Sequence, residues 1–406
     1  MTTQAHEPLA LDVVSRDDNR MILSMGPQHP STHGVLQIMT ELDGEVLVRA
    51  DPEIGYLHTG IEKTAENLFW TQAPTVIERM DYLSPLSNAM CFILGIERLL
   101  GIGDRIPERA QQLRVLLCEL HRIASHCVWL GTGMIDLGAI SPFFYAFDLR
   151  ENILDLTEAS GGARMHPNYL RIGGLREDVP KGFFDALDAL IEKYPARMGD
   201  LRRLLVKNPI LQDRMVDVGI LEADEAIAWG LTGPSLRGSG IAYDVRKAYP
   251  YSGYEQYEFD VPTRSEGDSY ARFLVRLDEM DEAMRIVRQV RKRLAGGPVM
   301  IDDPKIAPPP KETIAVSMEA LIHHFKLVSE SFRVPPGDVY QAIESPRGEL
   351  GYYIVSNGEN RPWRVRTRPP SMYNLQVLKK MAIGELIADM VVMLGSLDPV
   401  FGEVDR

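Results

Sequence analysis

The sequence predicts an α+β protein that is predominantly α-helical, a helical bundle with small antiparallel β elements from its N- and C-terminal regions. Apolar residues recur at helical spacing through most of the middle of the chain, which is typical of amphipathic helices. Two hairpin signals, Asp43-Gly44 and Asn357-Gly358, stand between short apolar runs near the two ends. No internal repeat, low-complexity segment or obvious linker interrupts the chain, so we expect one compact unit.

This unit divides into a β-rich region at 1–60, a helical core at 61–345, and a hairpin with a terminal helix and tail at 346–406. The expected strands are Met21–Met25, Val35–Leu42, Glu45–Ala50, Tyr352–Val355 and Trp363–Thr367. In each pair of strands the turn dipeptide lies between the two runs, so each pair should form an antiparallel hairpin.

The helices are expected from about Gly60 onwards, where apolar residues change to helical spacing. The expected helices are Leu86–Leu100, Pro107–Leu130, Phe143–Ser160, Pro180–Leu205, Glu222–Trp229, Ser269–Leu294, Glu312–Ser331 and Leu375–Leu394. Pro85 suits the first turn of one helix, and Gly161-Gly162 should end another. In Ser269–Leu294 the apolar residues lie opposite a highly charged face, and Ala295–Pro310 is expected to be a loop.

The composition limits the classes of function that are open to this protein. The 406 residues are 45% apolar, enough for a large core, yet no run approaches the ~20 apolar residues of a membrane span. The segment Met1–Arg20 is polar and acidic and does not resemble a secretory signal, so we expect a cytosolic or peripheral protein. A net charge of −13 disfavours nucleic acid as a partner.

The three cysteines, Cys91, Cys118 and Cys127, form no CxxC pair. They should be small core residues, since scattered thiols make no disulfide framework and an iron–sulfur cluster normally takes four thiolates. The chain also lacks GxGxxG, GxxxxGK[ST], HExxH and GxSxG motifs, and its LRGSG segment is expected to be a structural turn. We therefore expect no NADH site within it.

The segment GPQHPSTHG, from Gly26 to Gly34, concentrates two histidines and two prolines in nine residues. Proline fixes its own φ and restricts the preceding residue, so the loop should be stiff and suited to preorganised contacts. His29 and His33 are metal-ligand types, but no thiol or carboxylate stands nearby to complete a site. The residues alone leave open a functional loop or a turn with satisfied imidazoles.

Two further segments carry candidate chemistry. In RMDYLSP, the phenol of Tyr82 can donate a hydrogen bond and a proton to a carbonyl, although a surface tyrosine at a helix start is common. In GTGMIDLGAISPFF, Asp136 is a lone carboxylate in an apolar, glycine-rich bend, where it is costly unless paired. A histidine is its natural partner, and Asp136 would raise that imidazole's basicity.

These segments together resemble the D-type subunits of NADH-quinone oxidoreductase, which form the quinone site of respiratory complex I. The resemblance covers about Met21 to Arg406. The motifs that carry it are GPQHPSTHGVL, IGYLHTGIEK, RMDYL, ELHRIASH, LGTGMIDLGAISPFFYAF, RMHPNYLRIGG, LRGSGIAYDVRKAYPY, SMEALIHHFK, GELGYYIVS and FGEVDR.

That family is itself similar to the large subunit of nickel–iron hydrogenases, which implies a bundle of that type. In the hydrogenases, an early and a late CxxC pair hold the metals. Here Asp81 and Ser84 fall at the early pair, and Val400 and Glu403 at the late one. Because these residues cannot rebuild a soft metal site, the resemblance implies no metal.

The resemblance also implies roles for individual residues. Tyr82 and His33 would hydrogen-bond the quinone head group, and Asp136 would pair with that histidine. Arg79 and His166 would lie near, without ligating, the terminal iron–sulfur cluster of the neighbouring B-type subunit. Weaker candidates for the wider quinone pocket are His29, His126 and Thr132.

The implied function is that of a subunit of a proton-translocating NADH:quinone oxidoreductase, in which electrons from that cluster reduce ubiquinone or menaquinone. Quinone would be a substrate, no cofactor would be held permanently, and NADH would bind elsewhere in the complex. The implied partners are the B, C and I subunits and membrane-arm subunits such as H and A, with indirect attachment to the cytoplasmic side of the cell membrane. Alternatives are a ferredoxin-fed relative, a hydrogenase subunit or a metal-free scaffold.

Overall fold

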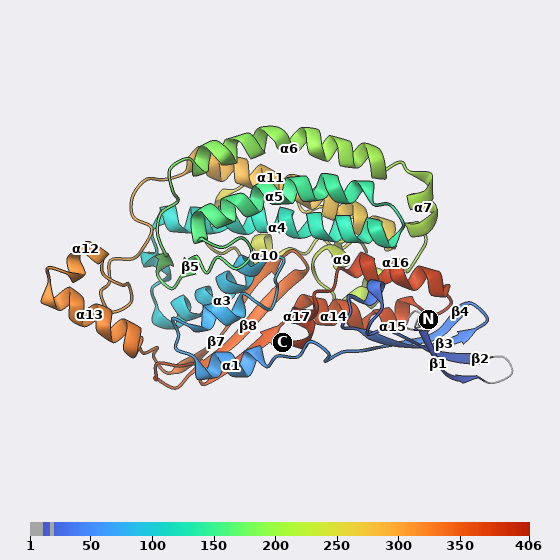
Figure 1. Ribbon diagram of the computed structural model, residues 1–406, viewed down its shortest axis with the longest axis horizontal. Coiled ribbons are helices and arrows are strands. Elements are labelled where there is room, and N and C mark those ends of the chain that lie inside the picture. The colour runs from blue at the N-terminus through green and yellow to red at the C-terminus, as the bar shows by residue number, and fades with distance from the viewer. Residues whose placement is uncertain (1–10, 17–19) are drawn as a thin grey trace, which may run out of the picture.

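Four long helices form one layer of the molecule. The computed structural model describes residues 11–16 and 20–406, so most of the polar segment Met1–Arg20 lies outside the described residues. The helices α4 (Glu108–Asp136), α5 (Ser141–Gly161), α6 (Phe183–Leu205) and α11 (Ser269–Arg293) lie side by side (Figure 1). The predominantly helical α+β class is confirmed.

The N-terminal sheet lies at one end of the molecule, below the helical layer in Figure 1. Its strands follow chain order and are antiparallel: β1 (Leu11–Arg16), β2 (Arg20–Met25), β3 (Gln37–Asp43) and β4 (Val46–Glu53). Gly44 has φ 63° in the turn between β3 and β4, which glycine adopts without strain. The predicted hairpin is confirmed, and β1 was not predicted.

The second sheet has the order β7 (Gly337–Ser345), β8 (Gly348–Ser356) and β9 (Arg364–Arg368), all antiparallel. The predicted hairpin corresponds to β8 and β9, and β7 was missed. The expected region boundary at 345/346 falls in the turn that joins β7 to β8. Helix α3 (Pro85–Leu100) packs on this sheet, and a Cβ on its Gly95 would meet Ile354 Cδ1 at 2.8 Å. Glycine therefore permits this close approach.

Helix α4 is longer than predicted, because it continues through Gly131 and Gly133 to Asp136. A Cβ on Gly131 would meet the rings of Phe143 at 3.0 Å and Phe147 at 3.2 Å, so this glycine lets α5 pack closely. The expectation that Asp136 lies in a glycine-rich bend was wrong: it is the last residue of the helix. Gly131 therefore permits close packing of two helices and does not form a turn.

The C-terminal helix expected at Leu375–Leu394 is broken into α14 (Pro370–Gln376), α15 (Leu378–Met381) and α16 (Ile387–Leu397). Between α15 and α16 the chain runs beside β4. There Gly384 N donates to Leu47 O, and Leu47 N donates to Glu385 O, both at 2.8 Å. Long-range strand pairing therefore overrides local helix propensity. A last helix, α17 (Phe401–Asp405), follows.

The segment expected as one helix at Glu312–Ser331 forms α12 (Lys311–Ile314) and α13 (Met318–Ser329), which project from the body (Figure 1). The remaining elements are η1 (Pro30–Thr32), α1 (Ile61–Asn67), α2 (Ala73–Ile77), η2 (Gly103–Arg105), β5 (Leu170–Arg171), β6 (Gly174–Leu175), α7 (Pro209–Met215), α8 (Ala223–Ala228), α9 (Gly233–Arg237), α10 (Val245–Ala248) and η3 (Tyr254–Gln256). Within the described ranges, no helix has the length and hydropathy to cross a bilayer.

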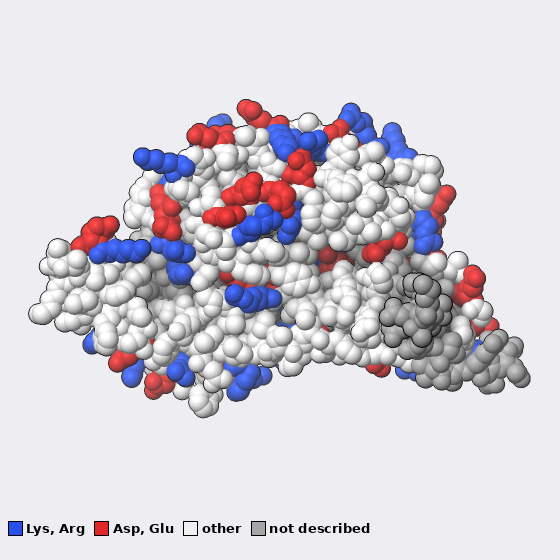
Figure 2. All heavy atoms as spheres, in the orientation of Figure 1, with Lys and Arg blue, Asp and Glu red and all other residues white. Residues whose placement is uncertain are grey.

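The charged face of α11 is partly inside the protein, because Arg272, Arg276 and Glu279 are fully buried. Glu279 accepts hydrogen bonds from Arg122 at 3.2 Å and from Arg237 at 3.1 Å, so its charge is compensated within the core. On the outer face, acidic and basic side chains are interspersed over the helical layer (Figure 2). The three cysteines are buried, as predicted.

Candidate functional site

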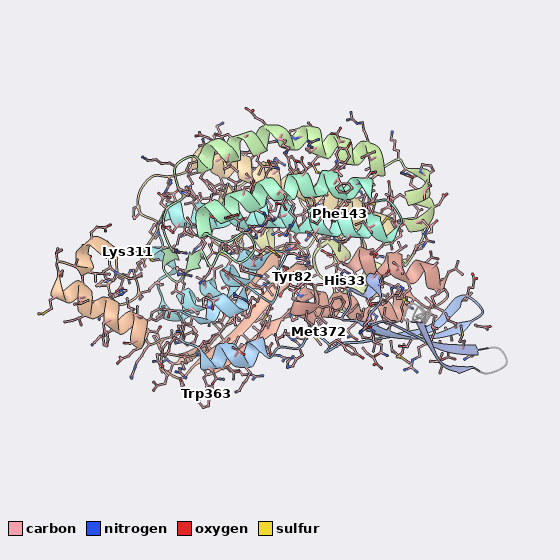
Figure 3. All side chains as sticks on the ribbon, in the orientation of Figure 1. His33, Tyr82, Phe143, Lys311, Trp363 and Met372 are labelled. Carbon is pink, nitrogen blue, oxygen red and sulfur yellow. The ribbon has the colours of Figure 1, made fainter. Side chains whose placement is uncertain are left out.

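The candidate site lies where three loops meet below the helical layer. His33 follows η1, Tyr82 lies between α2 and α3, and Asp398 lies between α16 and α17. Figure 3 labels Tyr82 and His33 in this region, close to α14 and α17. The negative charge of Asp398 raises the pKa of both side chains, although it is not the dominant influence on either. The fold thus brings these segments, distant in sequence, into one electrostatic environment.

The His33 loop is held by its own hydrogen bonds. Thr32 is buried, and its hydroxyl donates to the carbonyls of Pro27 at 3.1 Å and His29 at 2.9 Å. His33 caps η1 in the left-handed conformation, with φ 57°, and its backbone N–H donates to Pro30 O at 3.2 Å. This arrangement fixes the direction in which the imidazole leaves the backbone.

The imidazole of His33 packs against the ring of Phe401, with the centroids 5.5 Å apart, although the residue as a whole remains exposed. Desolvation lowers the pKa of His33, and the carboxylate of Asp398 partly opposes this shift. The ring is therefore neutral at pH 7, with one nitrogen as donor and the other as acceptor. His29 differs, because its Nδ1 accepts a hydrogen bond from Ser31 N at 3.2 Å and caps η1.

Tyr82 is half-buried, beside a fully buried aspartate. One oxygen of Asp81 accepts hydrogen bonds from the backbone N–H groups of Leu83 at 3.0 Å and Ser84 at 3.1 Å, which fixes the loop. The hydroxyl of Tyr82 forms no hydrogen bond with any other residue of the described ranges. Desolvation, followed by the charge of Asp81, raises the pKa of Tyr82, so the phenol stays protonated and available as a donor.

Arg347 joins the two segments at which the hydrogenase resemblance puts metal-binding cysteines. Its guanidinium is fully buried and donates to the second oxygen of Asp81 at 2.9 Å. Its Nε lies 3.3 Å from Asp398 Oδ2 as an ion pair without hydrogen-bond geometry. Sequence reasoning missed both Arg347 and Asp398 as site residues.

Several polar atoms of this cluster have no hydrogen-bond partner in the described part of the chain. They are Arg347 Nε and Nη2, Asp398 Oδ2 and Glu403 Oε1. Desolvation and the neighbouring Asp81 raise the pKa of Glu403 to about 8, whereas Arg347 and a hydrogen bond from Ser371 oppose the shift. Glu403 is therefore a buried carboxylic acid that holds its proton at pH 7.

Asp136 lies apart from the hydrogen bonds of this cluster. It lines a small cavity with Trp129, Met215 and Val392, and desolvation raises its pKa to about 6. Within residues 20–406 no hydrogen bond or ion pair joins Asp136 to His33. The carboxylate that acts on the pKa of His33 is instead that of Asp398.

Arg79 and His166 are neighbours near the surface. Arg79 is exposed, and its guanidinium donates to the carbonyl of Thr75. Desolvation and then the charge of Arg79 lower the pKa of His166, while Asp81 raises it. The Nδ1 atom of His166 is buried without a hydrogen-bond partner in the described residues. The structure therefore brings this expected pair together, within electrostatic range of the Asp81 loop.

The remaining candidates belong to the helical layer. His126 is fully buried, and its Nε2 lies 3.1 Å from Glu279 Oε2. Desolvation lowers the pKa of His126 despite this partner. Thr132 donates to the carbonyl of Val128 at 2.9 Å, one helical turn earlier. Their hydrogen bonds thus serve the interior of the bundle.

The donor atoms of the cluster suit a polar organic ligand. Among residues 11–16 and 20–406, no three His, Cys, Asp or Glu side chains are grouped to hold a metal ion. The carboxylates of Asp81 and Asp398 face the guanidinium of Arg347. A neutral phenol and a neutral imidazole beside this charged centre can both donate hydrogen bonds to oxygen.

Comparison with known proteins gives a consistent result. A family model described as "Respiratory-chain NADH dehydrogenase, 49 Kd subunit" matches residues 136–406. The NADH-quinone oxidoreductase D 2 subunit of Chloroflexus aurantiacus is 54% identical over 389 residues, which cover 95% of this chain and 94% of that protein. The D subunit of Geotalea uraniireducens is 50% identical over 386 residues, covering 95% and 98%. The D 2 subunit of a Roseiflexus species is 51% identical over 409 residues, covering 100% and 98%.

Proposed function

Because the chain belongs to the family of the respiratory-chain NADH dehydrogenase 49 Kd subunit, we propose that its loop cluster is the quinone-reduction site of that complex. The family consists of subunits of NADH-quinone oxidoreductase, or complex I, so the chain acts within a multisubunit assembly. The proposal concerns which of its residues meet the quinone and what each of them does.

One observation carries the proposal: the Tyr82 hydroxyl has no hydrogen-bond partner in the described chain, although its neighbours are bonded and buried. Its neighbour Asp81 uses both carboxylate oxygens. A half-buried phenol with an unused donor and a neutral imidazole, both within the electrostatic influence of Asp398, suit the two-sided recognition of a carbonyl-bearing head group. Tyr82 and His33 would each donate to a quinone oxygen.

Reduction of a quinone to a hydroquinone takes two electrons and two protons. The electrons would arrive one at a time from the iron–sulfur cluster of the neighbouring B-type subunit. Tyr82 and His33 would stabilise negative charge that develops on the quinone oxygens through donated hydrogen bonds, and Tyr82 would supply one proton. The neutral His33 would supply the second proton after it takes one up, which Asp398 favours because its negative charge raises the pKa of that imidazole. The exposed Asp136, whose pKa is raised to about 6, would take up protons at the surface and replenish the site.

The surroundings of the cluster suggest how it is arranged within the complex. Arg79 and His166 would face the B-type subunit, where the cation would stabilise the reduced cluster and the imidazole would couple a proton to its reduction. The C and I subunits, and membrane-arm subunits such as H and A, would hold the chain on the cytoplasmic side of the membrane. NADH would bind elsewhere in the complex, and quinone reduction would be linked to proton pumping.

The variant Tyr82→Phe tests the donor role, because it keeps the ring and removes only the hydroxyl. We expect normal assembly and a loss of quinone reduction on the order of 100-fold, as for removal of a general acid. Electron transfer from NADH to a soluble acceptor that bypasses quinone should be unchanged. Tyr145→Phe is the matched control, because Tyr145 is exposed and distant in sequence from the cluster. Full quinone turnover in assembled Tyr82→Phe complex would refute the donor role.

A further inference from the structure

Strand β7 is an edge strand, since the order of the sheet is β7-β8-β9. Its register opposite β8 shows which of its backbone groups point outward. In the pair Glu344↔Glu349, Glu344 N donates to Tyr251 Oη at 3.2 Å and Glu349 N donates to Thr232 Oγ1 at 3.1 Å. These two residues are therefore a pair without mutual backbone hydrogen bonds.

Bonded and non-bonded pairs alternate along an antiparallel ladder, and the β7–β8 register is continuous. The pairs formed by Ala342, Tyr340 and Asp338 are therefore also non-bonded, and these residues direct their backbone N–H and C=O groups away from β8. Ala342 O accepts from the side chain of Gln341 at 3.0 Å. The other outward groups of these three residues have no hydrogen-bond partner in the described chain.

The other edge of the same sheet is closed by side chains. On β9, Val365 N donates to Glu66 at 3.3 Å, and Thr367 N donates to Glu62 at 2.9 Å, both from α1. The beginning of β4 is paired with the Gly384–Ile387 segment through Glu45 and Leu47. In contrast, β7 contains no proline or lysine to block pairing and stays open from Asp338 to Ala342.

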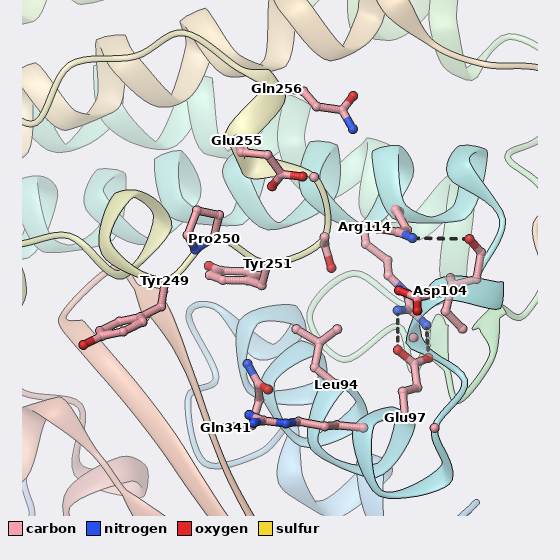
Figure 4. Close-up of a pocket in the computed structure, with 17 residues that line it drawn as sticks. Leu94, Glu97, Asp104, Arg114, Tyr249, Pro250, Tyr251, Glu255, Gln256 and Gln341 are labelled. Carbon is pink, nitrogen blue, oxygen red and sulfur yellow. Dashed lines mark hydrogen bonds and ion pairs between the residues drawn. The ribbon is translucent and has the colours of Figure 1, made fainter.

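The space beside this open edge is hollowed (Figure 4). A cavity of about 770 Å³ is lined by Arg98, Gln341 and Tyr249, among others. Two hollows of about 360 and 480 Å³ continue along β7 past Ala342, Tyr340 and Arg98. Tyrosine is common in protein–protein interfaces, where its ring packs and its hydroxyl bonds.

Arg98 is exposed and is the basic residue that lines all three hollows. Carboxylates line them too: Asp104, Glu255 and Glu97, which is paired with Arg114, in the first, and Glu349 and Asp338 in the other two. Arg98 forms no ion pair within the described residues, so its charge is available to an occupant. An occupant with a carboxylate opposite Arg98 would be matched in charge, and an extended backbone would match the alternating donors and acceptors of β7.

We propose that the open edge of β7 binds an extended, carboxylate-bearing segment of another polypeptide of the complex, which adds a fourth strand to the sheet. The outward groups of Asp338, Tyr340 and Ala342 would pair with its backbone, and the three hollows would receive its side chains. This inference rests on membership of a multisubunit complex and is independent of the quinone site.

Residue-resolved hydrogen–deuterium exchange tests the pairing in the isolated chain and in the assembled complex. In the isolated chain, the amides of Tyr340 and Ala342 should exchange rapidly, whereas those of Val339 and Gln341 should be protected by β8. In the complex, Tyr340 and Ala342 should slow by about 100-fold, as backbone pairing slows exchange. Equally rapid exchange in both samples would overturn the proposal, as would dimers of the isolated chain that protect the same amides.

Two variants test the same contact without reliance on exchange rates. Ala342→Pro removes one outward N–H, which edge strands tolerate, while Ala342→Ser keeps it. Only the proline variant should dissociate from the complex more readily. Arg98→Glu should weaken the retention of this chain in the complex about tenfold relative to Lys181→Glu. Lys181 is an exposed control residue that does not line the groove. Retention unchanged in both Ala342→Pro and Arg98→Glu complexes would overturn the proposal.

Discussion

Two buried polar regions of this molecule differ in how completely their carboxyl oxygens are bonded. In the network centred on the helical layer, Glu119 accepts hydrogen bonds from Arg122, Arg246 and Tyr254, and Glu344 of β7 binds Arg237. Every carboxylate oxygen of this network has a partner. In the cluster around Arg347, by contrast, Asp398 and Glu403 each have an oxygen without a partner in the described residues, whereas guanidinium nitrogens without a partner occur in both regions.

We interpret the network of bonded carboxylates as a structural scaffold and the cluster around Arg347 as a functional site. A buried charge is tolerated when its partners are complete, and such a network holds the helices in register. A buried carboxyl oxygen without a partner costs free energy, so it persists where a ligand or a reaction uses it. The helical layer is therefore expected to control stability, and the Arg347 cluster is expected to control activity. Four predictions, in order of effect, test this division.

The largest effect is expected in the helical network. Glu279→Ala would leave Arg122 and Arg237 buried with one fewer counter-charge, at a cost of ~3–5 kcal/mol in the free energy of unfolding. Urea denaturation of the purified chain measures this cost. Asp260→Asn is the control, because the Asp260 side chain is 85% exposed in its pair with Arg285. It should change stability by less than ~1 kcal/mol. Similar losses of unfolding free energy in Glu279→Ala and Asp260→Asn would refute the division between scaffold and site.

The next effect depends on pH and comes from Glu403. Its pKa is about 8 in the folded protein, far above the usual value for glutamate, so the unfolded chain releases this proton at lower pH. Stability must therefore fall as pH rises from about 5 to 8. Glu403→Gln removes this dependence. The free energy of unfolding of the variant, relative to that of the natural protein, should therefore increase by on the order of 2 kcal/mol across that range. A pH-independent difference would contradict the assignment.

A smaller effect is expected from Asp398→Asn, which keeps the side-chain shape and removes the charge. The pKa of His33 should fall, because the negative charge of Asp398 raises it. NMR titration of the His33 ring measures this shift. The pKa of His166, which is shifted by burial, Arg79 and Asp81, provides an internal reference. An unchanged His33 titration would exclude Asp398 as its electrostatic partner.

The smallest effect distinguishes two carboxylates. Asp136→Asn should leave the pKa of His33 nearly unchanged, because no contact joins the two residues in the described chain. The same NMR titration measures it. A shift as large as that in Asp398→Asn would restore the direct pairing that the sequence first suggested.

Much of the fold follows from local signals. Turn dipeptides predicted both hairpins, and apolar periodicity predicted the long helices. The break at Gly384 could not be predicted, because it results from pairing with β4, more than 300 residues earlier. The same limit applies to the cluster. Local chemistry identified Tyr82 and His33 as candidates, but the contact between Asp81 and Arg347 spans 266 positions, and no spacing rule connects them.

One backbone angle at the cluster has an evolutionary consequence. Asp398 adopts the left-handed conformation, with φ 52°, at the end of α16. Glycine adopts this conformation without that strain, so an aspartate here costs up to ~1 kcal/mol. Asp398→Gly would remove the strain but also a counter-charge of the buried Arg347, which costs more. A library screened for heat resistance and one screened for quinone reduction should therefore both keep the aspartate.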